Sequence, residues 1–279
     1  MSFFEDSSIL VTGGTGSFGK AFIRHALDTL NPRRVAVLSR DALKQIEMRA
    51  TFDDDRIRWF LGDIRDRDRL MRAFHGVDYV VHAAALKQVD TAEYNPFEFV
   101  KTNILGSQNV VDAAIESGVK KVVALSTDKA SSPINLYGAT KLTADKLFIA
   151  ANNYSDAGEA RFAVVRYGNV MGSRGSVIPL FKRLVAEGKP LPITDSRMTR
   201  FWITLPQAVD FVIHSFADMT GGELYVPRIP SMRVTDLAEA IAPGAGMTEI
   251  GIRPGEKLHE EMISTEDARR TVRRADRYV

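Results

Sequence analysis

The chain contains no cysteine among its 279 residues. This absence excludes disulfides, thiolate nucleophiles and cysteine-ligated metal centres. No apolar run approaches the roughly 20 residues that a helix needs to cross a bilayer, so we expect no membrane partner. The N-terminal stretch before the first apolar run is short and acidic and does not resemble a secretory signal; it begins Met-Ser-Phe-Phe-Glu-Asp. We therefore expect a cytoplasmic protein.

The chain also lacks a strong net charge. Its 37 basic and 35 acidic residues leave a net charge of +2, which gives no electrostatic case for a nucleic-acid partner. The run His259-Glu260-Glu261 is not a zinc motif, because no second histidine follows it, and we predict no metal site. Hydrophobic residues make up 45% and charged residues 26% of the chain. This composition is that of a globular protein with a full core and a smaller appended lobe.

A glycine series follows the first apolar run. Ile9 to Thr12 have β character, and the next residues are Gly13-Gly14-Thr15-Gly16-Ser17-Phe18-Gly19. Apolar residues then recur at helical spacing. In the order strand, glycine turn and helix, such a series predicts a dinucleotide site, where the backbone approaches a pyrophosphate at the helix N-terminus. The alternative is an ordinary glycine-rich turn.

Basic residues follow the second predicted strand, residues 35 to 38. The strand ends in Ser39-Arg40, and Lys44 lies one helical turn further on. In NAD-specific proteins an acidic residue near this point binds the ribose 2′-hydroxyl, whereas cations suit a 2′-phosphate. We therefore predict NADP as the cofactor, and we interpret Asp41 as a cap of the next helix. Alternatively, Arg40 and Lys44 are solvated surface charges.

Residues after the third and fourth predicted strands complete the predicted cofactor site. After the third strand, residues 57 to 61, Asp63 can accept from the adenine amino group and Ile64 can pack on the ring. The fourth strand ends in His82, which we interpret as a packed residue, and three small residues then allow close backbone approach to the cofactor: Ala83, Ala84 and Ala85. Lys87 lies in the following loop, at the edge of the sheet where ligands bind. It is either a ligand-binding residue or an ordinary surface lysine.

Residues 126 to 141 carry the chemistry of the site. The fifth predicted strand, residues 119 to 125, delivers Thr127, Asp128 and Lys129. Tyr137 and Lys141 are four residues apart, so they share one face of a helix. A lysine one turn from a phenol is expected to lower the phenol pKa from about 10, which makes the phenol a proton acceptor near neutral pH. Alone, this spacing also occurs by chance.

The alternation of strands and helices predicts an α/β fold, a Rossmann-type doubly wound parallel sheet with a smaller C-terminal substrate-binding lobe. We predict that residues 1 to 170 form the NADP-binding domain and that residues 203 to 227 return to it. Residues 171 to 202 and 228 to 279 would form the lobe. If Arg200 and Arg253 converge there, they would clamp a diphosphate; otherwise they are separate surface arginines. The predicted substrate-binding residues are Lys87, Asn169, Ser176, Val177, Arg200, Arg253 and Glu256.

The glycine series, Asp63 and Tyr137-x-x-x-Lys141 together resemble the extended short-chain dehydrogenase/reductase superfamily over nearly the whole chain. Four stretches are more specific: residues 12 to 19, 84 to 89, 126 to 129 and 166 to 176. They resemble the inverting UDP-N-acetylglucosamine 4,6-dehydratases, which begin pseudaminic acid synthesis. Members of that family continue further after the segment that matches residues 253 to 274, which leaves open whether the lobe is complete here.

This resemblance implies NADP, a UDP-sugar substrate and a homo-oligomer. It assigns the elimination to Asp128 and Lys129 and the C4 oxidation to Tyr137, while Lys141 orients Tyr137 and the nicotinamide ribose. Thr127 would hydrogen-bond near the sugar O4. Retaining relatives carry an Asp-Glu pair where this chain has Asp128-Lys129. To act as a base, Lys129 must be neutral, so we expect desolvation or nearby cations to lower its pKa from about 10.4.

Two other readings stay open. A sugar-nucleotide 4-epimerase or reductase of the same superfamily would use Tyr137 and Lys141 without an elimination pair. A non-catalytic NADP-sensing protein would bind the cofactor without turnover, although such proteins often lose the tyrosine or the lysine that this chain keeps.

Overall fold

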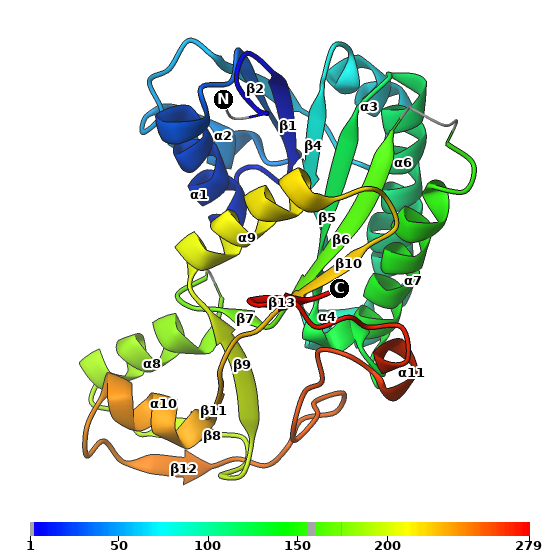
Figure 1. Cartoon of the computed structure of the whole chain (residues 1–279). Helices are drawn as coiled ribbons and strands as arrows, with labels where there is room; N and C mark the ends of the chain where they lie inside the picture. The colour runs from blue at the N-terminus through cyan, green and yellow to red at the C-terminus, as the bar shows by residue number, and fades with distance from the viewer. Residues whose placement is uncertain (1–2, 156–159, 174) are drawn as a thin grey trace.

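The computed structural model describes residues 3–155, 160–173 and 175–279. Within these residues, the largest element is an eight-stranded sheet with the order β13-β10-β6-β5-β4-β1-β2-β3 (Figure 1). Neighbouring strands are parallel except for β13, which pairs antiparallel with β10. The strands are β1 (Ser8–Thr12), β2 (Arg34–Ser39), β3 (Ile57–Leu61), β4 (Tyr79–His82), β5 (Lys121–Thr127), β6 (Arg161–Tyr167), β10 (Leu224–Pro227) and β13 (Arg277–Tyr278).

Helices cover both faces of this sheet, which confirms the predicted doubly wound α/β class (Figure 1). One face packs against α1 (Ser17–His25) and α9 (Leu205–Asp218), and α1 continues into the π-helical segment η1 (Ala26–Leu30). The other face packs against α3 (Arg67–Phe74), α6 (Gly106–Glu116) and α7 (Leu136–Ala151). Because the central strands are buried on both faces, they are continuous apolar runs rather than alternating ones.

Shorter helices connect these elements. Helix α5 (Pro96–Phe99) and the π-helical segment η2 (Val100–Leu105) lead directly into α6. Asp41 accepts a hydrogen bond from the Lys44 backbone, which confirms its predicted role as the cap of α2 (Ala42–Arg49). The remaining short helices of this part are α4 (Val89–Tyr94) and the 3₁₀ turn η3 (Asp128–Ala130).

A smaller lobe lies below the carboxyl ends of the parallel strands (Figure 1). Its own apolar core includes Phe181, Leu191 and Met198. The lobe contains β7 (Asn169–Val170), α8 (Val177–Ala186), β8 (Leu191–Ile193), β9 (Thr199–Ile203), β11 (Ser231–Arg233), α10 (Val234–Ile241) and β12 (Met247–Glu249). The short strand β7 pairs with β9, so the chain enters the small sheet two residues before the predicted boundary.

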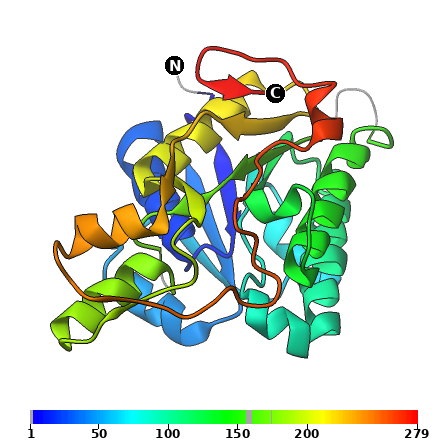
Figure 2. The same cartoon turned by 90° about the horizontal axis from the view of Figure 1, so that it is seen from below.

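The C-terminal segment runs from the lobe back to the large sheet (Figure 2). It passes the turn that follows β5, forms α11 (Thr265–Ala268) and ends in β13, which pairs with Val226 and Pro227. The sequence did not predict this return, because β13 is short and its neighbours are mostly charged. No helix among the described residues has the length and apolar character of a membrane span.

Candidate active site

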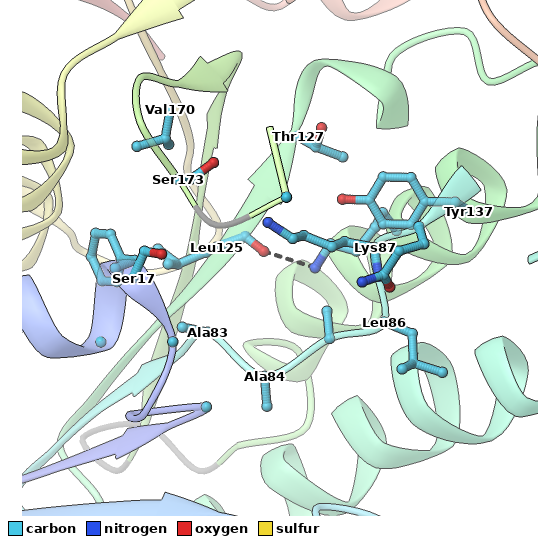
Figure 3. Close-up of a pocket in the computed structure, with 18 of the residues that line it drawn as sticks. Ser17, Ala83, Ala84, Leu86, Lys87, Leu125, Thr127, Tyr137, Val170 and Ser173 are labelled. Carbon is cyan, nitrogen blue, oxygen red and sulfur yellow. Dashed lines mark hydrogen bonds between the residues drawn. The ribbon is translucent and has the colours of Figure 1, made fainter. Parts of the chain in front are cut away.

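A cavity of about 900 Å³ opens at the carboxyl ends of the parallel strands, between the sheet and the lobe. Figure 3 shows Ser17 of the glycine turn on one side and Thr127 and Tyr137 on the other, with Ala83 and Ala84 between them. Every predicted cofactor residue lines this cavity: Gly13, Thr15, Gly16, Ser17, Phe18, Gly19, Ser39, Arg40, Lys44, Asp63, Ile64, Ala83, Ala84, Ala85, Lys87, Tyr137 and Lys141. The predicted catalytic residues Thr127, Asp128 and Lys129 line it too.

The glycine turn fits a dinucleotide pyrophosphate. Gly13 has a φ of +66°, and a Cβ there would lie 2.8 Å from the Ala84 nitrogen, so no larger residue fits. Helix α1 begins at Ser17 without a capping side chain and without an acidic residue in its first turn. Its N-terminal end therefore has the positive dipole and the open approach that an anionic group needs.

Basic side chains surround the end of β2. Arg40 is half exposed, and its Nη1 lies 3.7 Å from the Asp63 carboxylate. Lys44 Nζ lies 2.6 Å from Asp41. Both cations are thus at the cavity edge where the sequence placed a 2′-phosphate site, although each has a carboxylate partner in the structure.

The catalytic turn, residues 127 to 130, follows β5 directly. The Thr127 hydroxyl donates to Asp128 Oδ1 at 3.0 Å and accepts from the Lys129 backbone at 3.4 Å. Lys129 Nζ donates to the same Asp128 oxygen at 3.0 Å. Asp128 is fully buried, and its Oδ2 has no hydrogen-bond partner among the described residues. The turn therefore presents a buried carboxyl group and an ammonium group side by side.

The ammonium of Lys129 has a second partner that the sequence analysis missed. Glu260 Oε1 lies 3.4 Å from Lys129 Nζ, and the Glu260 side chain is almost fully buried. No local spacing could have revealed this contact, because the two residues meet only when the C-terminal segment crosses the catalytic turn.

The expectation of a lowered Lys129 pKa is wrong for this structure. Burial lowers the pKa of Lys129, but Asp128 and Glu260 together outweigh it and raise the pKa above its ordinary value. Lys129 is therefore an ammonium ion when the site is free of ligand, and it must lose a proton before it can act as a base.

The expected effect of Lys141 on Tyr137 is also wrong. Lys141 Nζ donates to the Leu125 carbonyl at 2.7 Å, the contact drawn in Figure 3. Burial raises the pKa of Tyr137 to about 12, and the opposing influences are Lys129 and the Thr127 hydroxyl. Spacing on a helix brought Tyr137 and Lys141 to one face, but burial dominates the phenol.

His82 is confirmed as a packed residue at the end of β4. It is 1% exposed, and its Nδ1 lies 2.8 Å from the Thr12 hydroxyl. Among the described residues, no three histidine, aspartate or glutamate side chains gather in a way that could hold a metal ion.

The predicted substrate-binding residues are only partly brought together. Those on the cavity wall are Lys87, Asn169, Ser176, Arg253 and Glu256. Arg253 is held by Glu256 at 2.8 Å. Arg200 and Val177 are not among the lining residues; the Arg200 guanidinium donates to the backbone of Thr199 and Leu258. The structure therefore does not bring Arg200 and Arg253 together on the cavity, and a substrate contact for Arg200 stays a prediction. Arg174, part of the motif at 166 to 176, lies outside the described residues.

Comparison with known proteins shows the family to which the chain belongs. A family model described as "polysaccharide biosynthesis protein" matches residues 9–279. The chain belongs to this family. Two relatives are informative. One is a protein of Campylobacter jejuni named UDP-N-acetylglucosamine 4,6-dehydratase (inverting), which is 58% identical over 96% of this chain and 80% of its own length. The other, of Rickettsia prowazekii and named UDP-glucose 4-epimerase, is 44% identical over 95% of this chain and 80% of its own.

Solved structures of the same architecture agree with the fold. The protein Pen from Bacillus thuringiensis matches with a TM-score of 0.95 and 42% identity, over 99% of this chain and 88% of that one. DesIV, a dTDP-glucose 4,6-dehydratase from Streptomyces venezuelae solved with NAD, matches with a TM-score of 0.84 and 26% identity, over 94% and 90% of the two chains. These matches confirm the Rossmann-type class that the sequence predicted for this family member.

Proposed function

We propose that the protein is an NADP-dependent UDP-N-acetylglucosamine 4,6-dehydratase that inverts C5. The observation that carries the proposal is the Asp128–Lys129 pair, 3.0 Å apart, on a cavity that also contains Tyr137. An acid and a base next to a phenol suit a reaction that combines oxidation with loss of water. The name of the Campylobacter relative supports the choice of substrate and of inversion.

The product would be UDP-2-acetamido-2,6-dideoxy-L-arabino-hexos-4-ulose. When bound, the cofactor would supply the hydride chemistry at C4 and C6, and the glycine turn and the strand-end residues of the cavity would hold it. Tyr137 accepts the proton of the 4-hydroxyl once its own phenol proton has passed, by way of Thr127, to the Asp128 carboxylate, and the resulting ketone acidifies the C5 proton. Lys129 removes that proton. Asp128 donates a proton to the departing C6 hydroxyl, and its unpartnered Oδ2 is the position for that proton. Lys129 then returns a proton to the opposite face of C5.

NADP rather than NAD is supported by the two cations at the end of β2. A half-exposed guanidinium and an ammonium at the cavity edge offer the charge and the hydrogen-bond donors that a 2′-phosphate requires. Neither Arg40 nor Lys44 is held by more than a partly exposed ion pair, so a phosphate can compete for each.

The wider setting rests on the resemblance described above. It supports a place at the start of pseudaminic acid synthesis, a homo-oligomeric assembly and a cytoplasmic location. The division into an NADP-binding domain and a substrate-binding lobe, with the cavity between them, is part of the same proposal.

The proposal is tested by incubating the purified protein, freed of nucleotide and reconstituted with NADP or NAD, with UDP-N-acetylglucosamine. We expect a product lighter by one water, formed faster with NADP, and deuterium at C5 when the reaction runs in heavy water. Lys129→Ala should lower the rate of water loss by roughly a hundredfold or more. Lys120→Ala is the matched control, since Lys120 is an exposed lysine paired with Asp78 on the opposite end of the sheet.

Two results would replace this function with another. A product of unchanged mass would favour a sugar-nucleotide 4-epimerase, the activity in the name of the Rickettsia relative. Binding of NADP without turnover of any sugar nucleotide would favour a sensing role. Full dehydration by Lys129→Ala would leave the reaction in place but reject Lys129 as the base.

A further inference from the structure

The Lys129 ammonium lies between two buried carboxylates. Asp128 Oδ1 is 3.0 Å and Glu260 Oε1 is 3.4 Å from its Nζ, and the two carboxylate side chains are 0% and 3% exposed. Asp128 belongs to the catalytic turn itself, whereas Glu260 comes from the C-terminal segment. Glu260 is not among the residues that line the cavity, so it reaches the reaction only through Lys129.

The position of Glu260 is set by neighbours that precede it in the chain. Lys257 Nζ donates to the Ser131 carbonyl at 2.7 Å, and the Asn135 amide donates to the Gly255 carbonyl at 2.7 Å. Figure 2 shows this part of the C-terminal segment crossing next to the start of α7. These bonds hold the segment against the catalytic turn without using the Glu260 carboxylate. Attachment of the C-terminal segment to the catalytic turn therefore does not explain why the Glu260 side chain is buried.

The Glu260 carboxylate is incompletely partnered. Its Oε1 contacts Lys129, while its Oε2 is buried without a hydrogen-bond partner among the described residues, and Lys257 Nζ is 3.9 Å away from it. A buried carboxylate with one unpaired oxygen costs stability, and a buried ion pair is weak evidence for a stabilising role. An oxygen of this kind is, however, well placed to carry a proton.

We propose that Glu260 is a positioning residue that takes up the proton which Lys129 must lose before it acts as the base. This inference rests on the proposed function. The proton moves from the Lys129 ammonium to the Glu260 carboxylate, leaving a neutral amine and a carboxylic acid. The amine then removes the C5 proton and becomes an ammonium again. After Asp128 has protonated the departing hydroxyl, the ammonium returns a proton to C5, and Glu260 gives its proton back to Lys129. Lys129 and Glu260 both end in their starting states.

The two carboxylates thus have separate tasks. Asp128 lines the cavity, has an unpartnered Oδ2 and transfers a proton to the leaving group, while Glu260 does not line the cavity and exchanges a proton only with the amine. While Glu260 holds the proton of Lys129, Asp128 keeps its own proton for the C6 hydroxyl.

The test is Glu260→Gln, which keeps the size of the side chain but cannot accept a proton from an ammonium. Two half-reactions are measured in single turnovers with NADP and UDP-N-acetylglucosamine: formation of the reduced nicotinamide by its absorbance, and incorporation of deuterium at C5 by NMR in heavy water. We expect C5 exchange to slow by roughly a hundredfold while C4 oxidation changes little. Because Glu260 does not line the cavity, the KM for the sugar nucleotide should also change little.

The matched control is Glu261→Gln, the neighbouring and exposed glutamate, whose carboxylate accepts from Ser132 at 2.9 Å. It should leave both half-reactions at the wild-type rates. Unchanged C5 exchange in Glu260→Gln would overturn the proposal, and so would an equal loss of both half-reactions, which is the signature of a purely structural role. If the glutamine variant does not fold, Glu260→Asp replaces it in the test. The shorter side chain moves the carboxylate away from Lys129, so this variant must also slow C5 exchange more than C4 oxidation.

The wild-type protein separates this inference from the function on which it rests. Absence of water loss by the wild type would reject the proposed function before any variant is made. Normal water loss by the wild type together with normal C5 exchange in Glu260→Gln would reject only the role of Glu260.

Discussion

Two lysines of the cavity have opposite surroundings. Burial lowers the pKa of Lys141, and only Asp145 acts against it. Burial also disfavours the charge on Lys129, but Asp128 and Glu260 reverse the result and raise its pKa. Residue type alone would give both lysines the same properties. Their different behaviour depends on which carboxylates the fold brings within a few ångströms.

His82 makes stability depend on pH. Burial, followed by the charge of Lys141, lowers the pKa of His82 from 6.5 to about 3. Below pH 6.5 the His82 imidazole binds a proton in the unfolded chain but not in the folded chain. The free energy of unfolding should therefore decrease as the pH falls from 6.5 towards 3. The slope for one such group is at most about 1.4 kcal/mol per pH unit.

Urea unfolding at several pH values between about 7 and 4.5 measures this slope. In His82→Gln the slope should be smaller, since the proton-binding site is gone from the unfolded chain. The control is His75→Gln, because His75 is exposed and should leave the slope unchanged. Equal slopes in the wild type and in His82→Gln would show that other groups cause the acid sensitivity.

At the scale of single elements, the first turn of α7 sets the geometry of the catalytic turn. The Asn135 side chain accepts from the Gly138 backbone at 2.7 Å and starts the helix. A Cβ at Gly138 would overlap the Lys129 carbonyl oxygen and lie 3.0 Å from Pro133. The absence of a side chain at this position is what allows helix and turn to pack so closely.

Gly138→Ala should therefore reduce activity, although alanine is normally the better helix former by about 1 kcal/mol. The added methyl pushes α7 away from Lys129 and separates Tyr137 from the acid-base pair. We expect the kcat for water loss to fall by about tenfold or more and the melting temperature to fall as well. Thr143→Ala, on the exposed face of the same helix, is the control. A fully active and more stable Gly138→Ala would contradict the packing argument.

At the scale of the whole molecule, one buried arginine connects three parts of the chain. Arg166 of β6 is 1% exposed. Its guanidinium donates to Asp145 of α7 at 3.2 Å, to the Met262 carbonyl at 3.2 Å and to Asp267 of α11 at 3.3 Å. It therefore joins the sheet, the catalytic helix and the C-terminal segment that carries Glu260.

Replacing Arg166 with methionine should lower the free energy of unfolding by about 3–5 kcal/mol, because Asp145 would stay buried without the cation that donates a hydrogen bond to it. Chemical denaturation of Arg166→Met measures the loss. Arg67→Met is the control, since Arg67 pairs with Glu116 at the surface, where both side chains are about half exposed and such a pair contributes little. A loss no larger than that of the control would mean that Asp145 is neutral in the folded protein and needs no partner.

Much of the fold and of the cavity follows from local pattern. Residues 57 to 61 form the third strand with the bounds that the sequence predicts, and the second predicted strand, residues 35 to 38, lies within β2. The glycine turn and the residues at the strand ends line one cavity because all parallel strands end at the same edge. Less was predictable in the lobe, where short strands such as β11 and β12 depend on pairing between distant segments.

The sequence by itself determined the Rossmann-type sheet, the nucleotide-binding turn and the presence of Tyr137, Asp128 and Lys129 at one strand end, since periodicity and spacing act over a few residues. Only the tertiary structure decided the charge on those groups and which side chains contact them. The ionic state of Lys129 depends on Glu260, which arrives from the far end of the chain. Burial and distance between remote segments are properties of the folded chain, and no local pattern encodes them.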